Sequence, residues 1–174
     1  MGAIQEYLYH VVRLSRPLTV VETGVYRGVS TSFILAALSD NGRGTLYSID
    51  LPSASYSIDE LSRSDRTPLH GRETPGFAVP QELMSRWKLT LGDTRVILPR
   101  ILQEVGPIDL FLHDSEHTYE CMSWEYQLAL ASIAPHGILA SDDINWNNAF
   151  QDLLESRTFA WSGSVSNKLG LVQV

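Results

Sequence analysis

Residues 19–31, with the sequence TVVETGVYRGVST, decide how the rest of the chain is interpreted. The stretch opens with β-branched apolar residues, which favour a buried strand. Gly24 then breaks the strand pattern, and Ser30 and Thr31 favour a helix start ahead of the apolar run at 33–38. A strand, a glycine turn and a helix in this order build a cradle for a ligand. Glycines let the backbone approach the ligand closely, and a helix N-terminus offers free N–H groups.

The glycine spacing excludes two common phosphate cradles. The dinucleotide fingerprint needs three glycines as G-x-G-x-x-G, and Tyr26 stands at the second glycine position. A P-loop is excluded too, because no Gly-Lys-Ser/Thr follows. What remains is Glu22, Gly24 and Gly28 in the pattern E-T-G-x-x-x-G, with an acid just before the turn. An acid there suits a ligand with a cationic end, and S-adenosylmethionine carries an ammonium and a sulfonium but no phosphate. The alternative is a plain βα turn that uses glycine for steric reasons.

The stretch resembles motif I of the class I S-adenosylmethionine-dependent methyltransferases. This resemblance implies that the cofactor site includes Glu22, Gly24, Tyr26, Gly28 and Ser30. Within it, Glu22 and the glycine turn are expected to hold the methionine end of the cofactor.

Length and composition favour a single soluble domain spanning 1–174. Such a chain is long enough to bury a proper core, and its net charge of −7 argues against a nucleic-acid partner. The only cysteine is Cys121, which excludes an intrachain disulfide and a cysteine zinc cluster. No secretory leader pattern and no bilayer-length apolar run is found. We therefore expect a cytoplasmic protein with no membrane partner.

Apolar periodicity predicts strands that alternate with helices. The first element is an amphipathic helix within 1–17, which either caps the sheet edge or forms a contact in a homo-oligomer. The expected strands are 19–23, 45–50, 88–93, 108–117, 137–143, 158–162 and 170–174, of which 108–117 and 137–143 include the residues just after the strand. The expected helices after the first are 30–39, 81–87, 99–104, 118–134 and 147–157. The alternation predicts an α/β, Rossmann-like doubly wound sheet with helices on both faces, which binds ligands at the carboxyl ends of its strands.

Residues 52–80 are the least regular part of the chain, rich in serine, proline and glycine. A loop of this length in a compact domain is usually functional, so we interpret it as an active-site lid that carries substrate contacts. The alternative is a disordered insertion.

Two acids that follow predicted strands suit the nucleoside part of such a cofactor. Asp50 lies about 20 residues past the glycine turn, where an acid binds ribose hydroxyls. Asp93 follows the third strand, where methyltransferases carry the acid that binds the adenine amino group. Each residue has a structural alternative as a cap, Asp50 for a turn and Asp93 for the next helix.

Three further acids follow the fourth and fifth strands. If these strands are neighbours, the ends that carry Asp114, Asp142 and Asp143 lie about 5 Å apart. Three carboxylates in one crevice repel one another unless a cation neutralises them, and oxygen ligands suit Mg²⁺. His117, on the same exit as Asp114, is a candidate general base. The alternatives are capping residues for the acids and a surface histidine for His117.

The sequences HDSEHTYE at 113–120 and GILASDD at 137–143 extend the resemblance. Together they look like the class I branch that includes the macrocin- and mycinamicin-type sugar O-methyltransferases, with a more distant similarity to catechol O-methyltransferase. The branch implies a seven-stranded sheet whose last strand is reversed. It also implies that Asp114, Asp142 and Asp143 hold Mg²⁺, that Asp114 borders the cofactor as well, and that His117 is the base.

Two departures from the pattern stand out. Catechol-type enzymes carry Asp-Asn where this chain has Asp142-Asp143, and relatives have more helices before the first strand. The enclosure of the substrate or the assembly is therefore expected to differ.

We interpret the protein as an S-adenosylmethionine- and Mg²⁺-dependent O-methyltransferase that acts on a hydroxyl of a small molecule, such as a sugar or a catechol-like diol. One rival is a metal-independent methyltransferase that uses His117 alone. A second is a non-catalytic cofactor-binding domain that acts through a partner protein. A third is a nicotinamide oxidoreductase, which Tyr26 at the second glycine position disfavours.

Overall fold

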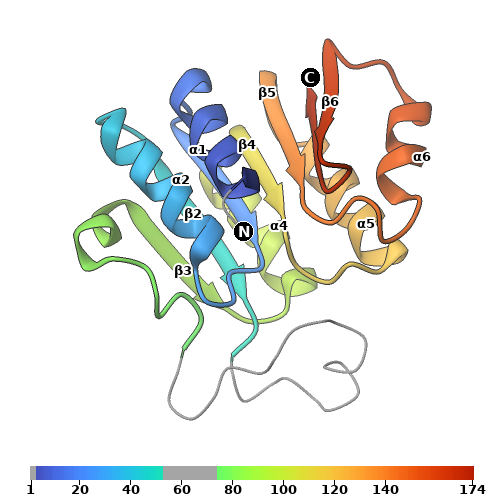
Figure 1. Ribbon diagram of the computed structural model, residues 1–174. Helices are drawn as coiled ribbons and strands as arrows, with labels where there is room; N and C mark the ends of the chain where they lie inside the picture. Colours follow the sequence, from blue (N-terminus) through green and yellow to red (C-terminus); the bar gives the residue numbers. More distant parts are fainter. Residues whose placement is uncertain (1–2, 53–73) are drawn as a thin grey trace.

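The computed structural model describes residues 3–52 and 74–174, which form a seven-stranded sheet between two layers of helices (Figure 1). The strand order is β3-β2-β1-β4-β5-β7-β6. Their bounds are β1 Thr19–Thr23, β2 Thr45–Asp50, β3 Trp87–Leu91, β4 Ile108–His113, β5 Ile133–Ser141, β6 Trp161–Val165 and β7 Leu169–Gln173. The first five strands are parallel, and β7 is antiparallel to both of its neighbours. This confirms the predicted α/β doubly wound fold with a reversed last strand.

Helices cover both faces of the sheet. On one face lie α1 (Ala3–Ser15), α2 (Val29–Asp40) and the 3₁₀ helix η2 (Gln81–Arg86); on the other lie α4 (Thr94–Val105), α5 (Tyr119–Leu130) and α6 (Ala149–Ser156). Side chains alternate along each strand, so each face has its own core. Val20 and Leu110 pack toward α2, whereas Val21 and Phe111 pack toward α5.

The chain changes direction across the sheet at β1 and β4. From β1 it passes through α2 to β2 and then to the edge strand β3, and it returns to the other side of β1 with β4. The carboxyl ends of β1 and β4 therefore border the switch point, where doubly wound sheets bind their ligands.

Two helix starts differ from the sequence prediction. The helix α4 begins at Thr94, so Pro99 lies inside it instead of at its first position. Asp93 caps this helix, and the only backbone donor lost at Pro99 is the one that would bond to Arg95, one turn back. The helix α2 begins at Val29 after Gly28, so neither Ser30 nor Thr31 is its cap. Its cap residue has left-handed backbone angles, which glycine adopts without strain.

The strand β5 starts four residues earlier than predicted, at Ile133. Its Pro135-His136-Gly137 segment, expected to end a helix, forms an irregularity in the pairing with β4 instead. The left-handed backbone of His136 (φ 68°) marks this bulge, which holds the proline without breaking the sheet. The predicted helix therefore ends at Leu130.

The predicted lid, 52–80, falls mostly outside the described residues, which omit 53–73. Its last part is described and packs on the glycine turn. The Gly76 amide donates to the Tyr26 carbonyl (2.7 Å), and the Ala78 amide donates to the Arg27 carbonyl (3.0 Å). This end of the segment is thus a fixed wall beside the turn.

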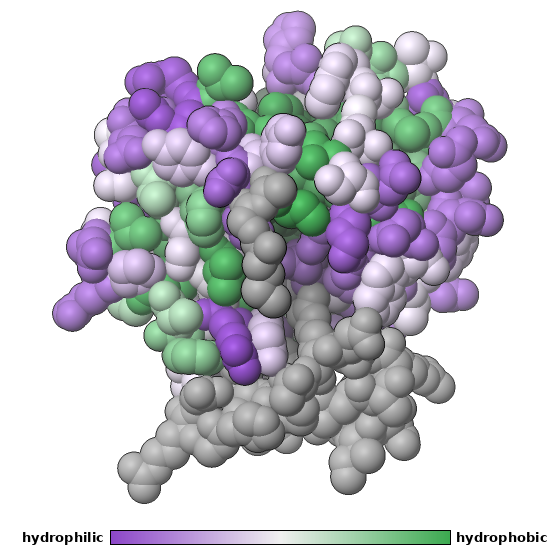
Figure 2. Space-filling view, in the orientation of Figure 1, coloured by the Kyte–Doolittle hydropathy of each residue, from purple (hydrophilic) through white to green (hydrophobic). Residues whose placement is uncertain are grey.

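The outer face of α1 carries apolar side chains. Leu14 is 85% exposed, and Tyr7 and the nearby Leu18 are about half exposed. Figure 2 shows further apolar side chains gathered between α1 and β5 on the same side of the molecule. Within the described residues, no helix is long and apolar enough to cross a membrane.

Candidate active site

The turns after β1 and β4 touch each other through their backbones. The Asp114 amide donates to the Thr23 carbonyl (2.8 Å), and a Cβ atom added to Gly24 would collide with the Asp114 carbonyl group. Gly24 also has a left-handed backbone (φ 81°). The first glycine of the motif is therefore required by the neighbouring turn, which brings the cradle and Asp114 together at the switch point.

Asp50, at the end of β2, shapes the glycine turn. One carboxylate oxygen accepts hydrogen bonds from the amides of Val25 (3.0 Å) and Tyr26 (2.6 Å), and the other accepts from the Leu51 amide (2.7 Å). These bonds hold Tyr26 in a left-handed conformation (φ 50°) that costs a non-glycine residue energy. The expected ribose role of Asp50 stays a prediction, and its structural role is to set the turn.

Glu22 is completely buried on the α2 side of β1. Its Oε2 atom accepts hydrogen bonds from the hydroxyls of Thr31 (2.9 Å) and Ser48 (2.7 Å), while Oε1 has no partner among the described residues. Burial raises the pKa of Glu22 to about 7, against the lowering effect of the two hydroxyl bonds. The carboxyl group therefore lies beneath the cradle with a pKa raised from its ordinary value toward neutrality.

Gly28 and Ser30 lie at the start of α2. A Cβ atom on Gly28 would approach a side-chain carbon of Val79 to 2.6 Å. The glycine therefore leaves room for residues 76–79 to pack against the turn. Ser30 is half-buried in the first turn of α2. Helix N-termini favour anionic groups, so this end of α2 suits a ligand carboxylate.

Asp93 accepts a hydrogen bond from the Arg95 amide (2.8 Å) and caps α4. Asp93 therefore does cap a helix, which was the structural alternative to a role in cofactor binding. The expected contact between Asp93 and adenine stays a prediction, and one carboxylate can fill both roles.

The metal-ligand candidates follow neighbouring strands. Asp114 follows β4 and Asp142 follows β5, and the Asp142 amide donates to the His113 carbonyl (2.9 Å). Asp143 has a left-handed backbone (φ 47°), and its carboxylate lies 4.0 Å from the Lys168 ammonium. Within 3–52 and 74–174, no three acidic, histidine or cysteine side chains are gathered closely enough to hold a metal ion. The backbone thus brings the strand ends together, but the three carboxylates are not assembled.

His117 lies on the loop between Asp114 and α5. Its ring is 5.2 Å from that of His113 in an edge-to-face arrangement, and 5.2 Å from that of Trp146. The loop ends at Thr118, whose hydroxyl caps α5. The rings of His113 and Trp146 therefore fix the position of the His117 ring, and its role as a general base stays a prediction.

The sequence analysis missed a buried polar cluster beneath this loop. Glu125 of α5 is fully buried and accepts hydrogen bonds from Thr23 (2.5 Å), His113 (2.7 Å) and Ser115 (2.9 Å), with the thiol of Cys121 at 3.7 Å. Burial alone would raise the pKa of Glu125, but the His113 imidazole and the hydroxyl donors outweigh it and hold this pKa below its ordinary value. The available signal was an acid on the apolar face of a predicted helix.

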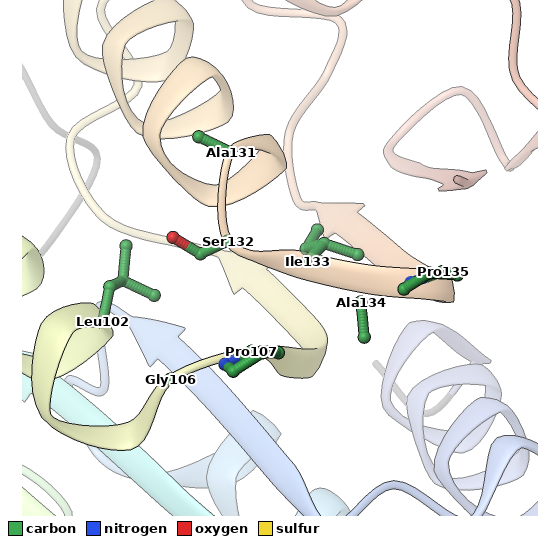
Figure 3. Close-up of a pocket in the computed structure, with 8 residues that line it drawn as sticks. All are labelled: Leu102, Gly106, Pro107, Ala131, Ser132, Ile133, Ala134 and Pro135. Carbon is green, nitrogen blue, oxygen red and sulfur yellow. The ribbon is translucent and has the colours of Figure 1, made fainter.

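A cavity of about 350 Å³ lies at the amino ends of β4 and β5, away from the candidate site (Figure 3). It is formed where α4 leads into β4 and α5 leads into β5. Its lining consists of Leu102, Gly106, Pro107, Ala131, Ser132, Ile133, Ala134 and Pro135. These residues lie before β4 and at the start of β5, so the cavity is separate from the crevice at the carboxyl ends.

Comparisons with known proteins agree with this arrangement. A family described as a methyltransferase domain matches residues 21–144, and the chain belongs to this family. The match begins in β1 and ends just past Asp143, so it includes the cradle and the candidate acids. No curated protein matches the chain in sequence.

Solved structures share the fold at low sequence identity. The chain is similar to a cofactor-bound protein, Rv0187, from MTB (TM-score 0.69, 15% identity, 100% of this chain and 80% of that one). It is also similar to the O-methyltransferase TomG from Streptomyces achromogenes in complex with SAM (0.65, 14%, 98% and 78%). A third is an O-methyltransferase from Bacillus cereus in complex with SAH (0.62, 15%, 99% and 80%).

Proposed function

We propose that the protein is an S-adenosylmethionine-dependent O-methyltransferase that acts on a hydroxyl of a small molecule. The observation that carries this proposal is the contact between Gly24 and Asp114 at the switch point. It joins the glycine turn, which follows the acid Glu22, to the turn that carries Asp114 and leads to His117, and so supports a cofactor site next to the candidate catalytic residues. Family membership and the SAM- and SAH-bound structures of similar fold support the choice of cofactor.

In this proposal each part of the crevice binds one part of the cofactor. The turn of Gly24–Gly28 and the start of α2, with Ser30, hold the methionine end, with Tyr26 beside them. Asp50 accepts from the ribose hydroxyls, and Asp93 accepts from the adenine amino group. Because these residues belong to four different elements, only the folded sheet binds the cofactor.

The chemistry of the three acids also suits a divalent metal, although binding one would require the carboxylates to come closer together than they lie in the described residues. Asp114, Asp142 and Asp143 supply only oxygen atoms, which Mg²⁺ prefers, and two of them follow adjacent strands. Asp143 would have to leave Lys168, an exposed and therefore weak ion pair. When bound, the metal would lower the pKa of a substrate hydroxyl.

The proposed reaction is an in-line displacement. His117 takes the proton from the substrate hydroxyl. The oxygen forms a bond to the methyl carbon as the bond from that carbon to sulfur breaks, and the sulfonium becomes a neutral thioether. No covalent enzyme intermediate is needed, so the protein contributes mainly by positioning the two reactants.

Thermal melting tests the cofactor part. S-adenosylhomocysteine should raise the melting temperature by mass action, and NAD should not. Equal stabilisation by the two compounds would contradict the proposal and favour a nicotinamide enzyme.

Melting in the presence of Mg²⁺ tests the metal part. Mg²⁺ should stabilise the wild type, and Asp142→Asn and Asp143→Asn should each abolish that increment, whereas His117→Ala should keep it. Loss of methyl transfer in chelator would agree with a metal-dependent enzyme. If wild type and both Asp variants respond alike, the acids are capping residues and the metal is not part of the site.

The partners and the domain organisation stay predictions. The apolar outer face of α1 is consistent with a homo-oligomer, which sedimentation of the purified protein would reveal. A single domain over residues 1–174 and a lid over 52–80 are retained as proposals. The lid would show as amides that exchange quickly in the free protein and slowly once cofactor and substrate are bound.

A further inference from the structure

Three polar residues form a row across the sheet just beneath the candidate site. Thr23, His113 and Ser141 are the last residues of β1, β4 and β5. They lie in register, with Thr23 paired to His113 and His113 paired to Ser141, and all three are completely buried. A row of buried polar side chains is costly unless each one is hydrogen-bonded.

Two consecutive residues of α5 bind this row and leave only the Nε2 atom of His113 without a partner among the described residues. Glu125 accepts from Thr23 (2.5 Å) and from the Nδ1 atom of His113 (2.7 Å). The hydroxyls of Tyr126 and Ser141 are 2.6 Å apart, and the Ser141 hydroxyl donates in turn to the Asp142 carbonyl (3.2 Å). One turn of a single helix therefore binds the ends of three strands.

Each residue of the row directly precedes a residue of the proposed site. Gly24, Asp114 and Asp142 come next in the chain, and each lies at the point where its strand opens into a turn. Two backbone bonds join these turns, from the Asp114 amide to Thr23 (2.8 Å) and from the Asp142 amide to His113 (2.9 Å). Fixing the row therefore fixes where the next three residues lie.

We propose that Glu125 and Tyr126 are positioning residues that hold the ends of β1, β4 and β5 and so set the places of Gly24, Asp114 and Asp142. The catalytic meaning of these places rests on the proposed function, whereas the positioning itself does not. Glu125 acts on the β1–β4 side, where the cofactor cradle is, and it also binds Ser115 just after Asp114. Tyr126 acts on the β5 side alone.

The substitutions Glu125→Gln and Tyr126→Phe change one polar group each and keep the side-chain shape. A glutamine at 125 replaces one acceptor oxygen with an NH₂ group that faces donors, so part of the row loses its acceptor. Glu120→Gln and Tyr119→Phe are matched controls, because both residues lie on the exposed side of the same helix. The Tyr119 hydroxyl donates to the exposed Asp152 (2.7 Å).

Residue-resolved amide hydrogen exchange on the unliganded protein is the primary test. In Glu125→Gln, the Asp114 and Asp142 amides should exchange at least ~10-fold faster, beyond the change at mid-strand amides such as Leu110. In Tyr126→Phe, the excess should be confined to Asp142, because the bond that is lost joins Tyr126 to Ser141, the residue before Asp142. The two control variants should show no excess.

Binding of S-adenosylhomocysteine, measured by calorimetry well below the melting temperature, is the second readout. Glu125→Gln should weaken it by about 10-fold, within the range seen when supporting hydrogen bonds are removed, and Tyr126→Phe should leave it unchanged. Failure of the wild type to bind would overturn the cofactor assignment and leave the exchange test standing. Exchange at Asp114 and Asp142 that only follows the mid-strand amides would overturn the positioning role, because Glu125 would then contribute to overall stability alone.

Discussion

Two completely buried glutamates lie beneath the crevice, one on each face of the sheet, and their surroundings shift their pKa values in opposite directions. Glu22, toward α2, accepts hydrogen bonds from two hydroxyls at one oxygen, and its pKa rises to about 7. Glu125, toward α5, has an imidazole and two hydroxyls as donors, and its pKa falls below its ordinary value. Both side chains are completely buried.

The two acids are equally buried and differ in what lies beside them. Desolvation opposes ionisation at both positions, but only Glu125 has a histidine beside it. On the α5 side, Glu125 therefore acts as a clamp that holds Thr23, His113 and Ser115. The α2 side gains or loses a proton near neutral pH, so a cationic ligand above Glu22 would favour its ionised form.

The largest effect is expected when the clamp is removed. Glu125→Leu leaves Thr23, His113 and Ser115 without their acceptor and should destabilise the protein by about 3–5 kcal/mol, as breaking a buried pair usually does. Denaturant unfolding measures this loss, with Glu120→Leu on the exposed side of α5 as the control. A loss below about 1 kcal/mol would mean that the cluster is weakly bonded.

Gly24→Ala tests the contact that joins the two turns. The added methyl group meets the Asp114 carbonyl and needs a left-handed backbone, so we expect a loss of about 2–4 kcal/mol and no binding of S-adenosylhomocysteine. Gly42→Ala is the matched control, because Gly42 has a similar backbone (φ 67°) with nothing within 4 Å. It should cost about 1 kcal/mol. Equal losses would show that backbone strain alone matters at Gly24.

Glu22→Gln should stabilise the protein at high pH. Because the pKa of Glu22 rises from 4.5 to about 7 on folding, the folded state holds this proton more tightly. Stability from this group is complete below about pH 4.5 and is lost as the pH rises through 7. The variant should therefore match the wild type at pH 4 and exceed it by up to about 3 kcal/mol at pH 8. Unfolding curves at both pH values, with the exposed Glu6→Gln as control, test this; a constant difference would refute the shifted pKa.

The smallest effect is expected when the Tyr126 hydroxyl, which bonds to Ser141, is removed. Tyr126→Phe removes one neutral hydrogen bond and should cost about 1 kcal/mol, because the ring still packs against Phe150. Tyr119→Phe, whose hydroxyl bonds at the surface, should change the unfolding free energy by less. If the two variants were equally destabilised, the Ser141 bond would have no special weight.

The fold was predictable because its signals are local. Strand β1 shows a β-branched run, α5 shows helical spacing, and the strand–helix alternation dictates a parallel sheet. The boundaries were less predictable where tertiary contacts prevail. The cap at Asp93 starts α4 five residues before Pro99, and Pro135 lies in a β5 bulge instead of ending a helix.

The candidate site was predictable as a set of strand-end residues, but its internal bonds were not. The glycine spacing indicated a cradle, but no sequence pattern shows that Gly24 meets Asp114 or that Asp50 accepts from the amides of the turn. Glu125 was missed because its partners are 102 residues away at Thr23 and 12 away at His113. Such contacts depend on strand order and register, which local periodicity does not encode.

The most direct test of the central claim is calorimetric titration of the unmodified protein with S-adenosylhomocysteine. The account predicts saturable binding at about one site per chain, strong weakening in Asp50→Ala and little change in Asp40→Ala, an exposed acid at the far end of α2. NAD should produce no binding heat under the same conditions. Binding of NAD with equal affinity, or no heat with S-adenosylhomocysteine, would contradict the assignment of the crevice to a methyltransferase cofactor.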